Sequence, residues 1–328
     1  MYKLKPFIQD NLNKEFWRQL SKNPNAIQIL EKNLDKINWY LLSQNPSAIE
    51  LLLKNPDKID FRTLSLNSNP KAIDILKKNL DKILWVELSG NPSGIQLLSE
   101  NLDKLDQNCW NRLSENPLGI SLLSENLDKV NWQALSRNPS MIDILSKNLD
   151  KVDWGYFSQN FNAMHIFEKN LDKISWTGLA LNKNPEVIKI LSKNLNKLNK
   201  YAWSNLSTNL NAVQILSENL DKVNWASLSM NPSAIDILSK NLDKVKWHGL
   251  SSNPLAISIL EKNLDKLNND CWAWLSSNPN IFDLDYEYLK NHICDIRQEL
   301  IEKVLHPSRV HKILNKGISI EEFNNIYG

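Results

Sequence analysis

The chain has 328 residues, a net charge of +2 at pH 7, 42% hydrophobic residues and 23% charged residues, the composition of an ordinary folded protein. The near-neutral charge argues against nucleic acid or an anionic membrane as partner. No stretch approaches the roughly 20 apolar residues of a membrane span. The three cysteines, Cys109, Cys271 and Cys294, are not the even set of a disulfide-bonded protein, so we expect a reducing compartment, the cytoplasm.

Residues 1–22 are interpreted as an N-terminal cap that contains half of a repeat unit. Asn11 to Lys14 resemble the NLDK segment that recurs further on, and Trp17 occupies the tryptophan position of that unit. The opening segment, MYKLKPFIQDNLNKEF, has no apolar run typical of a signal peptide.

Residues 23–280 form a tandem array in which a unit of about 22 residues recurs, as in NLDKVNWASLSMNPSAIDILSK at 219–240. The dipeptide Asn231-Pro232 predicts a helix start, because Asn caps helices and Pro is tolerated at the first helical position. We expect a helix from Pro232 to about Lys240, ended by Asn241 in the left-handed conformation. A second helix of about six residues should start at Trp225.

Twelve such helix starts follow one another along the chain. They lie at Asn23, Asn45, Asn69, Asn91, Asn116, Asn138, Asn160, Asn184, Asn209, Asn231, Asn253 and Asn278. Three-residue additions precede Trp110, Trp203 and Trp272, and we expect them to form three enlarged loops along one edge.

Helices this short are marginal alone, so the units must stabilise one another by stacking. Each unit offers a tryptophan or phenylalanine, and burying one tryptophan removes about 150–250 Å² from water. The sequence therefore predicts an all-α right-handed α-solenoid, or superhelix, of about eleven two-helix repeats with terminal caps, and a core built on the tryptophans. Residues 281–328 are expected to be a C-terminal helical cap.

The Asp-Lys pair of each unit, such as Asp35 with Lys36, is expected to form salt bridges between units and to cap helix starts. A lysine ladder that follows a phosphate backbone is the alternative, but an Asp beside nearly every Lys cancels its field. One unit is unusually aromatic, with Tyr156, Phe157, Phe161 and Phe167; repacking of the core explains this, and an exposed anchor for a partner is the alternative.

Recognition by a solenoid depends on positions that are polar and differ between units. One such column follows the tryptophan, and it is the predicted protein-binding surface: Arg62, Glu87, Arg112, Gln133, Tyr156, Asn205, His248 and Trp274. A second lies in the middle of the longer helix: Gln28, Glu50, Asp74, Gln96, Asp143, His165, Lys189 and Gln214. The alternative for both columns is neutral sequence drift on a solvent-exposed face.

Enzyme signatures are missing: there is no glycine-rich phosphate loop among eight glycines, no G-x-S-x-G and no CxxC pair. His292, Cys294, His306 and His311 fit no zinc spacing. We therefore expect no catalytic residues, no metal and no cofactor.

The run W-x-x-L-S-x-N-P-x-A-I-x-x-L-x-x-N-L-D-K, as in 225–244, resembles the tandem short-repeat proteins of giant DNA viruses. The resemblance covers nearly the whole chain. More loosely, the unit is similar to leucine-rich variant repeats, which pair an α-helix with a 3₁₀ helix in a right-handed superhelix. This chain lacks the cysteine-rich iron–sulfur segment that can accompany them. The resemblance implies a viral protein in the host cell cytoplasm.

The sequence predicts a non-catalytic scaffold that binds a protein partner, a host factor if the protein is viral, away from any membrane. It favours a monomer but does not determine the oligomeric state. Two alternatives remain open. Single-stranded nucleic-acid binding would follow the precedent of helical repeats that read one base per unit, and a structural or virion-assembly role would need no soluble partner.

Overall fold

The computed structural model describes residues 2–9 and 12–291. The chain divides into two compact units, Leu4–Phe282 and a second unit that joins residues 1–3 to 283–328. At the ends, β1 (Tyr2–Leu4) and β2 (Phe282–Leu284) pair in a two-stranded sheet, and α25 (Tyr286–Asn291) follows. Of the predicted C-terminal cap, residues 292–328 lie outside the described residues, and with them the four His and Cys residues of the tail.

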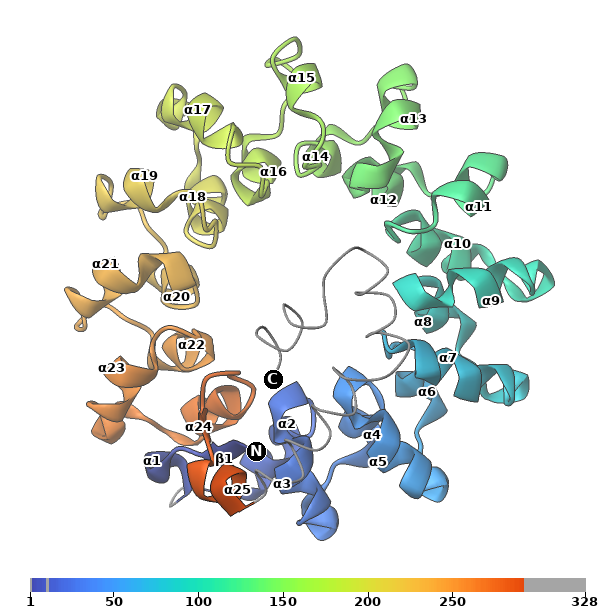
Figure 1. The fold of residues 1–328 in the computed structure, drawn as a ribbon. Helices are drawn as coiled ribbons and strands as arrows, with labels where there is room; N and C mark the ends of the chain where they lie inside the picture. Colours follow the sequence, from blue (N-terminus) through green and yellow to red (C-terminus); the bar gives the residue numbers. More distant parts are fainter. Residues whose placement is uncertain (1, 10–11, 292–328) are drawn as a thin grey trace, which may run out of the picture. The chain divides into compact units, whose positions relative to one another are not determined.

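Residues 4–282, taken by themselves, form an all-α solenoid in which short helices alternate between an inner and an outer circle (Figure 1). The inner helices are α2 (Lys14–Leu20), α4 (Trp39–Ser43), α6 (Phe61–Leu64), α8 (Trp85–Ser89), α10 (Gln107–Ser114), α12 (Trp132–Arg137), α14 (Trp154–Phe157), α16 (Trp176–Leu181), α18 (Lys200–Leu206), α20 (Trp225–Ser229), α22 (Trp247–Ser252) and α24 (Asn269–Ser276). The outer helices are α1 (Pro6–Gln9), α3 (Ile27–Glu31), α5 (Ile49–Lys54), α7 (Pro70–Lys77), α9 (Ile95–Ser99), α11 (Ile120–Glu125), α13 (Ile142–Lys147), α15 (Met164–Phe167), α17 (Val187–Ser192), α19 (Val213–Ser217), α21 (Ile235–Ser239) and α23 (Ile257–Glu261).

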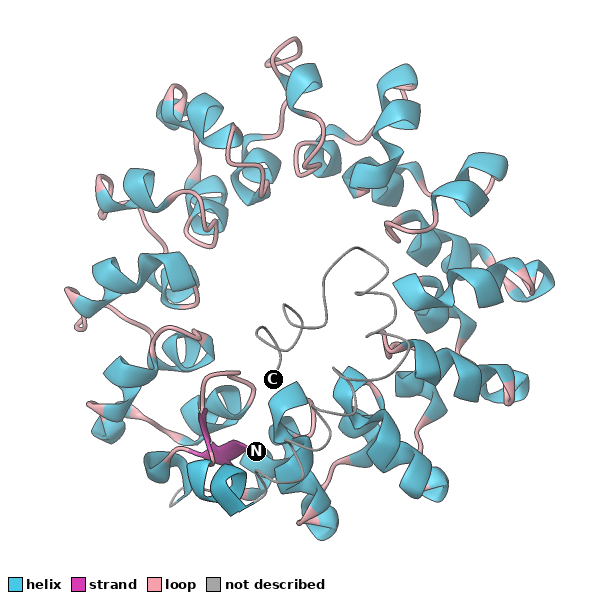
Figure 2. Ribbon diagram, viewed as in Figure 1, coloured by secondary structure: helices cyan, strands magenta, loops and turns pink. Residues whose placement is uncertain are grey.

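Short 3₁₀ helices and loops join these elements, and Figure 2 shows the loops in pink between the helices. Five precede outer helices: η1 (Pro24–Ala26), η3 (Pro46–Ala48), η6 (Pro92–Gly94), η8 (Pro139–Met141) and η10 (Pro232–Ala234). Six carry the NLDK segment: η2 (Leu34–Lys36), η4 (Pro56–Lys58), η5 (Leu80–Lys82), η7 (Leu102–Lys104), η9 (Leu195–Lys197) and η11 (Leu264–Lys266). The predicted helix 232–240 is therefore a 3₁₀ turn followed by α21.

Two local predictions were wrong. The three-residue additions do not form enlarged loops; they add a helical turn before the tryptophan, in α10, α18 and α24. The asparagine after each outer helix is not left-handed either, since φ is −139° at Asn33 and −132° at Asn148. Its side chain ends the helix in another way, by donating from Nδ2 to the carbonyl oxygen four residues earlier, at 2.8 Å for Asn241 and Ile237.

The core is built on leucine more than on tryptophan. The leucine three residues after the aromatic position is fully buried in unit after unit, as at Leu42, Leu135 and Leu228. Each such leucine contributes about 1.5–3 kcal/mol by leaving water. The tryptophans divide into two groups: Trp17, Trp110, Trp203 and Trp272 are buried, whereas Trp39, Trp85, Trp132, Trp154, Trp176, Trp225 and Trp247 are partly buried against the core.

A ladder of buried asparagines joins each unit to the one before it. At Asn138, Nδ2 donates to the carbonyl oxygens of Ser114 and Asn116, both at 3.0 Å, while Oδ1 accepts from the Ser140 amide at 3.1 Å. The side-chain amide is thus fully used inside the core. Within residues 12–291 the ladder consists of Asn23, Asn45, Asn67, Asn91, Asn116, Asn138, Asn160, Asn182, Asn209, Asn231, Asn253 and Asn278.

The ladder shows that two units start two residues earlier than the sequence pattern suggested. Asn69 and Asn184, which the sequence pattern suggested as unit starts, cap the following turns, whereas Asn67 and Asn182 hold the buried ladder positions. The two extra residues are inserted between the ladder asparagine and the proline, where they leave the packing of the units unchanged.

The ladder has no free end, because the first unit stacks on the last. Asn23 Nδ2 donates to the carbonyl oxygens of Ser276 and Asn278, at 3.1 and 3.2 Å, the same pair of bonds that Asn45 and Asn138 make with their preceding units. Helix α2 packs directly against α24. The repeat array of residues 4–282 is therefore a closed ring (Figure 1).

The twelfth unit combines both ends of the array. Its inner helix is α24, and α1 takes the outer place between α23 and α3 (Figure 1). The Lys5 amide donates to the Ile281 carbonyl at 2.9 Å, the Phe7 and Trp272 rings lie 6.4 Å apart, and Ile8 is fully buried. The N-terminal segment thus supplies the outer helix that the last unit lacks.

Candidate protein-binding surface

All eight residues of the predicted binding column lie on inner helices. The elements are α6 for Arg62, α8 for Glu87, α10 for Arg112, α12 for Gln133, α14 for Tyr156, α18 for Asn205, α22 for His248 and α24 for Trp274. The column is in fact two neighbouring rows, one residue and two residues after the aromatic position. Because one residue turns an α-helix by about 100°, the two rows face different directions.

Several of these side chains connect adjacent inner helices. Arg112 lies 3.7 Å from Glu87, and Asn205 Nδ2 donates to the Thr177 carbonyl at 3.0 Å. The Arg137 guanidinium lies over the Tyr156 ring, 4.8 Å from its centroid. Gln133 Nε2 also donates to Asp153 at 3.4 Å. These members of the column take part in contacts between units, which leaves less of their surface for a partner.

Trp274 is the member most suited to contact a partner, since its side chain is 51% exposed. It lines a pocket of about 540 Å³ between the first and the last inner helix, with Gln19 from α2, Lys22 just after α2, and Asp270 and Ser277 from the α24 region. A half-exposed tryptophan beside a hollow is the kind of residue that carries binding energy at interfaces.

Glu15 also lines this pocket, and its carboxylate is held in place. Gln19 Nε2 donates to it at 3.0 Å and Arg18 at 2.7 Å, and the hydrogen bond from Gln19, followed by that from Arg18, lowers the pKa of Glu15. The pocket therefore combines an aromatic surface with charges of both signs. Sequence reasoning missed the α2 residues because only ring closure brings them next to Trp274.

The aromatic unit in the middle of the array is mainly a repacked core. Phe157 and Phe167 are fully buried, and their rings meet edge to face with centroids 5.8 Å apart. Phe161 is 46% exposed and lines a separate pocket of about 440 Å³ with Leu181 and Arg137.

The Asp-Lys pairs do not form the predicted bridges between units in the part of the chain described. Lys58, Lys104 and Lys266 lie 3.0–3.3 Å from the aspartate of their own unit. Other lysines of this series lie over the aromatic ring of the preceding unit, at 4.6–5.6 Å from its centroid: Lys36 over Trp17, Lys82 over Phe61, Lys129 over Trp110, Lys151 over Trp132, Lys173 over Trp154, Lys197 over Trp176, Lys222 over Trp203 and Lys244 over Trp225. The pair therefore joins units mainly through cation–π contacts.

The second predicted column lies on the outer helices and is exposed, as at Glu50, Asp74 and His165. Among the described residues, no three His, Cys, Asp or Glu side chains are grouped to hold a metal ion. Cys109 and Cys271 are buried free thiols, and burial raises the pKa of the Cys109 thiol. No helix in residues 2–9 and 12–291 has the length and apolar character to cross a membrane. No family model, curated protein or solved structure matches the chain.

Proposed function

We propose that the protein is a non-catalytic scaffold that binds a protein partner at the inner circle of its ring, with Trp274 as the main anchor. The observation that supports this most is the exposed indole beside a pocket of about 540 Å³, in an array whose other inner tryptophans pack on the core. Arg62 and His248 are also exposed on inner helices, but they belong to the other row and face a different direction from Trp274. The resemblance to giant-virus repeat proteins favours a host protein as partner, in the cytoplasm.

The test is a pull-down from host-cell lysate, with and without nuclease, that compares the wild-type chain with Trp274→Ala. Truncating an anchor of this kind costs at least about 2 kcal/mol, or roughly 30-fold in affinity, so the retained proteins should be lost. Tyr201→Ala is the matched control, because Tyr201 is also an exposed aromatic residue of an inner helix.

Equal recovery of the same proteins by the wild type and by Trp274→Ala would contradict the assignment of this anchor. Loss of every bound protein on nuclease treatment would instead indicate single-stranded nucleic acid as the ligand. High copy number in purified virions, with no soluble partner, would indicate a structural role.

A further inference from the structure

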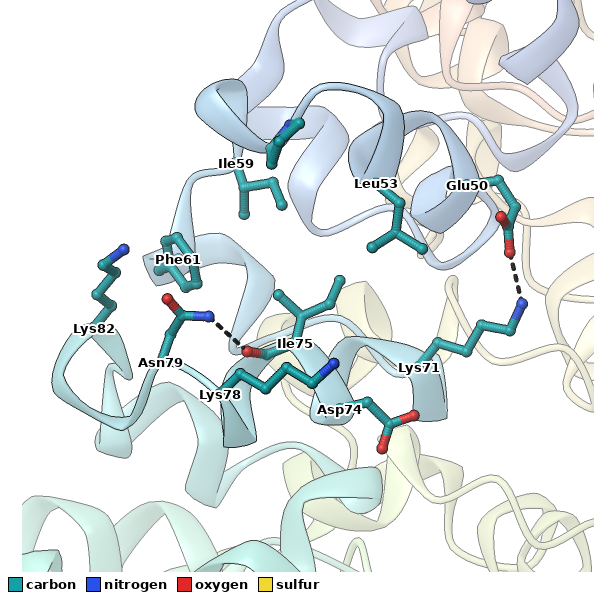
Figure 3. Close-up of a pocket in the computed structure, with 11 residues that line it drawn as sticks. Glu50, Leu53, Ile59, Phe61, Lys71, Asp74, Ile75, Lys78, Asn79 and Lys82 are labelled. Carbon is teal, nitrogen blue, oxygen red and sulfur yellow. Dashed lines mark hydrogen bonds and ion pairs between the residues drawn. The ribbon is translucent and has the colours of Figure 1, made fainter.

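A second groove lies between the outer helices α5 and α7 and reaches Phe61 at the start of the inner helix α6 (Figure 3). It holds about 590 Å³, and its apolar lining comes from Leu53, Pro56, Ile59, Phe61 and Ile75. In Figure 3 the side chains of Leu53, Ile59 and Ile75 point into the space between the two helices, and Phe61 closes one end. The groove is mainly apolar and open to solvent.

Three of the residues that line this groove depart from the repeat. Leu53 stands where other units have only Ser, Glu or Lys: Glu31, Lys77, Ser99, Ser124, Ser146, Glu168, Ser192, Ser217, Ser239 and Glu261. Pro56 replaces the leucine of the NLDK segment, and Phe61 replaces the tryptophan that the other inner helices carry at this position. The repeat units are otherwise nearly identical in sequence, so it is notable that three residues that differ from the repeat line the same groove.

Each departure makes the groove more suitable for an apolar group. Leu53 adds an apolar wall and is itself 50% exposed, which leaves hydrophobic surface in water. Phe61 has a smaller ring than tryptophan, and Pro56 is more compact than the leucine it replaces, so both leave space. The position of Leu53 is polar elsewhere, so the stacking of units does not require an apolar side chain there.

The charges around the groove are unequally distributed. At one end Lys71 and Glu50 form an ion pair of 2.6 Å, and their hydrogen bond lowers the pKa of Glu50 and raises that of Lys71, so that both stay charged and offset each other. Lys82 lies at the other end, over the Phe61 ring at 4.7 Å. Lys78 and Asp74 lie between the two ends (Figure 3). Apart from the Lys71–Glu50 ion pair, the groove is lined by two lysines, Lys78 and Lys82, and one carboxylate, that of Asp74, so positive charge is in excess.

We propose that this groove binds a short extended segment of a partner protein that carries a large apolar side chain next to acidic residues. The apolar side chain enters between Leu53 and Ile75 above Phe61, and the acidic residues lie toward Lys78 and Lys82. A protonated lysine over an aromatic ring attracts a carboxylate without leaving the ring. The site is separate from Trp274, so either proposal can fail without the other.

The test is fluorescence anisotropy with the full chain and a fluorescein-labelled hexapeptide, Asp-Glu-Leu-Phe-Asp-Glu. Two probes of the same length accompany it: Lys-Arg-Leu-Phe-Lys-Arg, which reverses the charge, and Asp-Glu-Ser-Gly-Asp-Glu, which lacks the apolar pair. We expect the first peptide to bind the tightest and its affinity to fall as salt is raised.

Leu53→Ser should weaken binding of the first peptide by about tenfold, because one side of the apolar contact is removed. Serine is the residue that several other units carry at this position, so the fold should be unaffected, as a thermal melt would show. Phe61→Trp should weaken binding as well, by filling the groove with the ring of the ordinary unit. Lys78→Glu should reduce affinity, whereas Lys147→Glu, at the equivalent position of α13, should not.

Any of three results would overturn the proposal. They are no binding of the acidic apolar peptide to the wild-type chain, equal binding to the wild type and to a folded Leu53→Ser variant, and tighter binding of the basic peptide. None of these results bears on the Trp274 pull-down.

Discussion

At the scale of single residues, the buried asparagine is the most constrained position in each unit. In Asn138, the side-chain NH₂ donates hydrogen bonds to two carbonyl oxygens of the preceding unit, and Oδ1 accepts a hydrogen bond from a backbone amide of its own unit. Aspartate would offer no donors, and glutamine would place the amide one methylene too far along. The side chain therefore acts both as a helix cap and as a connector between units.

Replacing Asn138 with Ala should lower the free energy of unfolding by about 3–5 kcal/mol, because two buried carbonyl groups and one amide lose their partners together. Denaturation by urea, followed by circular dichroism, measures the change. The control is Asn162→Ala, whose Nδ2 donates to the Pro139 carbonyl at 3.0 Å in an exposed position. We expect less than about 1 kcal/mol there, and equal losses would contradict the ladder.

At the scale of elements, the length of the inner helix decides how deeply its tryptophan is buried. Helices α10, α18 and α24 carry an additional turn before the tryptophan, and α2 also starts early; their tryptophans are 4–7% exposed. Inner helices that begin at the tryptophan leave the ring partly exposed, often with a lysine of the next unit over it.

This difference predicts unequal effects of one substitution. Trp110→Ala should cost about 3–5 kcal/mol, the usual loss for a buried tryptophan, and Trp132→Ala clearly less, about 1–3 kcal/mol. Both variants are compared by urea denaturation with the wild type. An equal or larger loss at Trp132 would mean that the partly exposed rings contribute as much to stability as the covered ones.

At the scale of the whole repeat array, closure removes the exposed apolar ends that a linear solenoid must cap. The full turn of 360° divided among twelve ladder units gives about 30° for each. The N-terminal helix α1 completes the twelfth unit, so the ends of the array are held by the same contacts as its interior. Ile8 and Ile281 are fully buried there.

Much of this architecture follows from the sequence pattern. The Asn-Pro steps, the leucine spacing and the helix alternation are local signals that repeat, so fold class and element order could be predicted from them. The choice between tryptophan and leucine as the deepest residue could not, because it depends on how neighbouring units cover each ring. Closure could not be predicted either, since it results from a small rotation accumulated over all units.

The same limit applies to the candidate sites. Trp274 could be identified from its position after an ordinary tryptophan, but Gln19 and Lys22 lie more than 250 residues away in sequence and meet it only when the ring closes. Leu53 and Phe61 are visible as departures from the repeat. Their common groove requires the packing of α5 against α7, which the pattern alone does not place.

The most direct test of the account is a cross-link between the first and the last unit. Lys22→Cys and Ser277→Cys place two thiols in one pocket, in a chain whose Cys294 is replaced by Ser, while the buried Cys109 and Cys271 stay unreactive. A short bis-maleimide at low protein concentration should link them within one chain, as a shifted monomer band on a denaturing gel. The control pair, Lys22→Cys with Arg137→Cys on α12 across the ring, should give no such band. Failure of the first pair to link within one chain, in a folded variant, would contradict the closed ring.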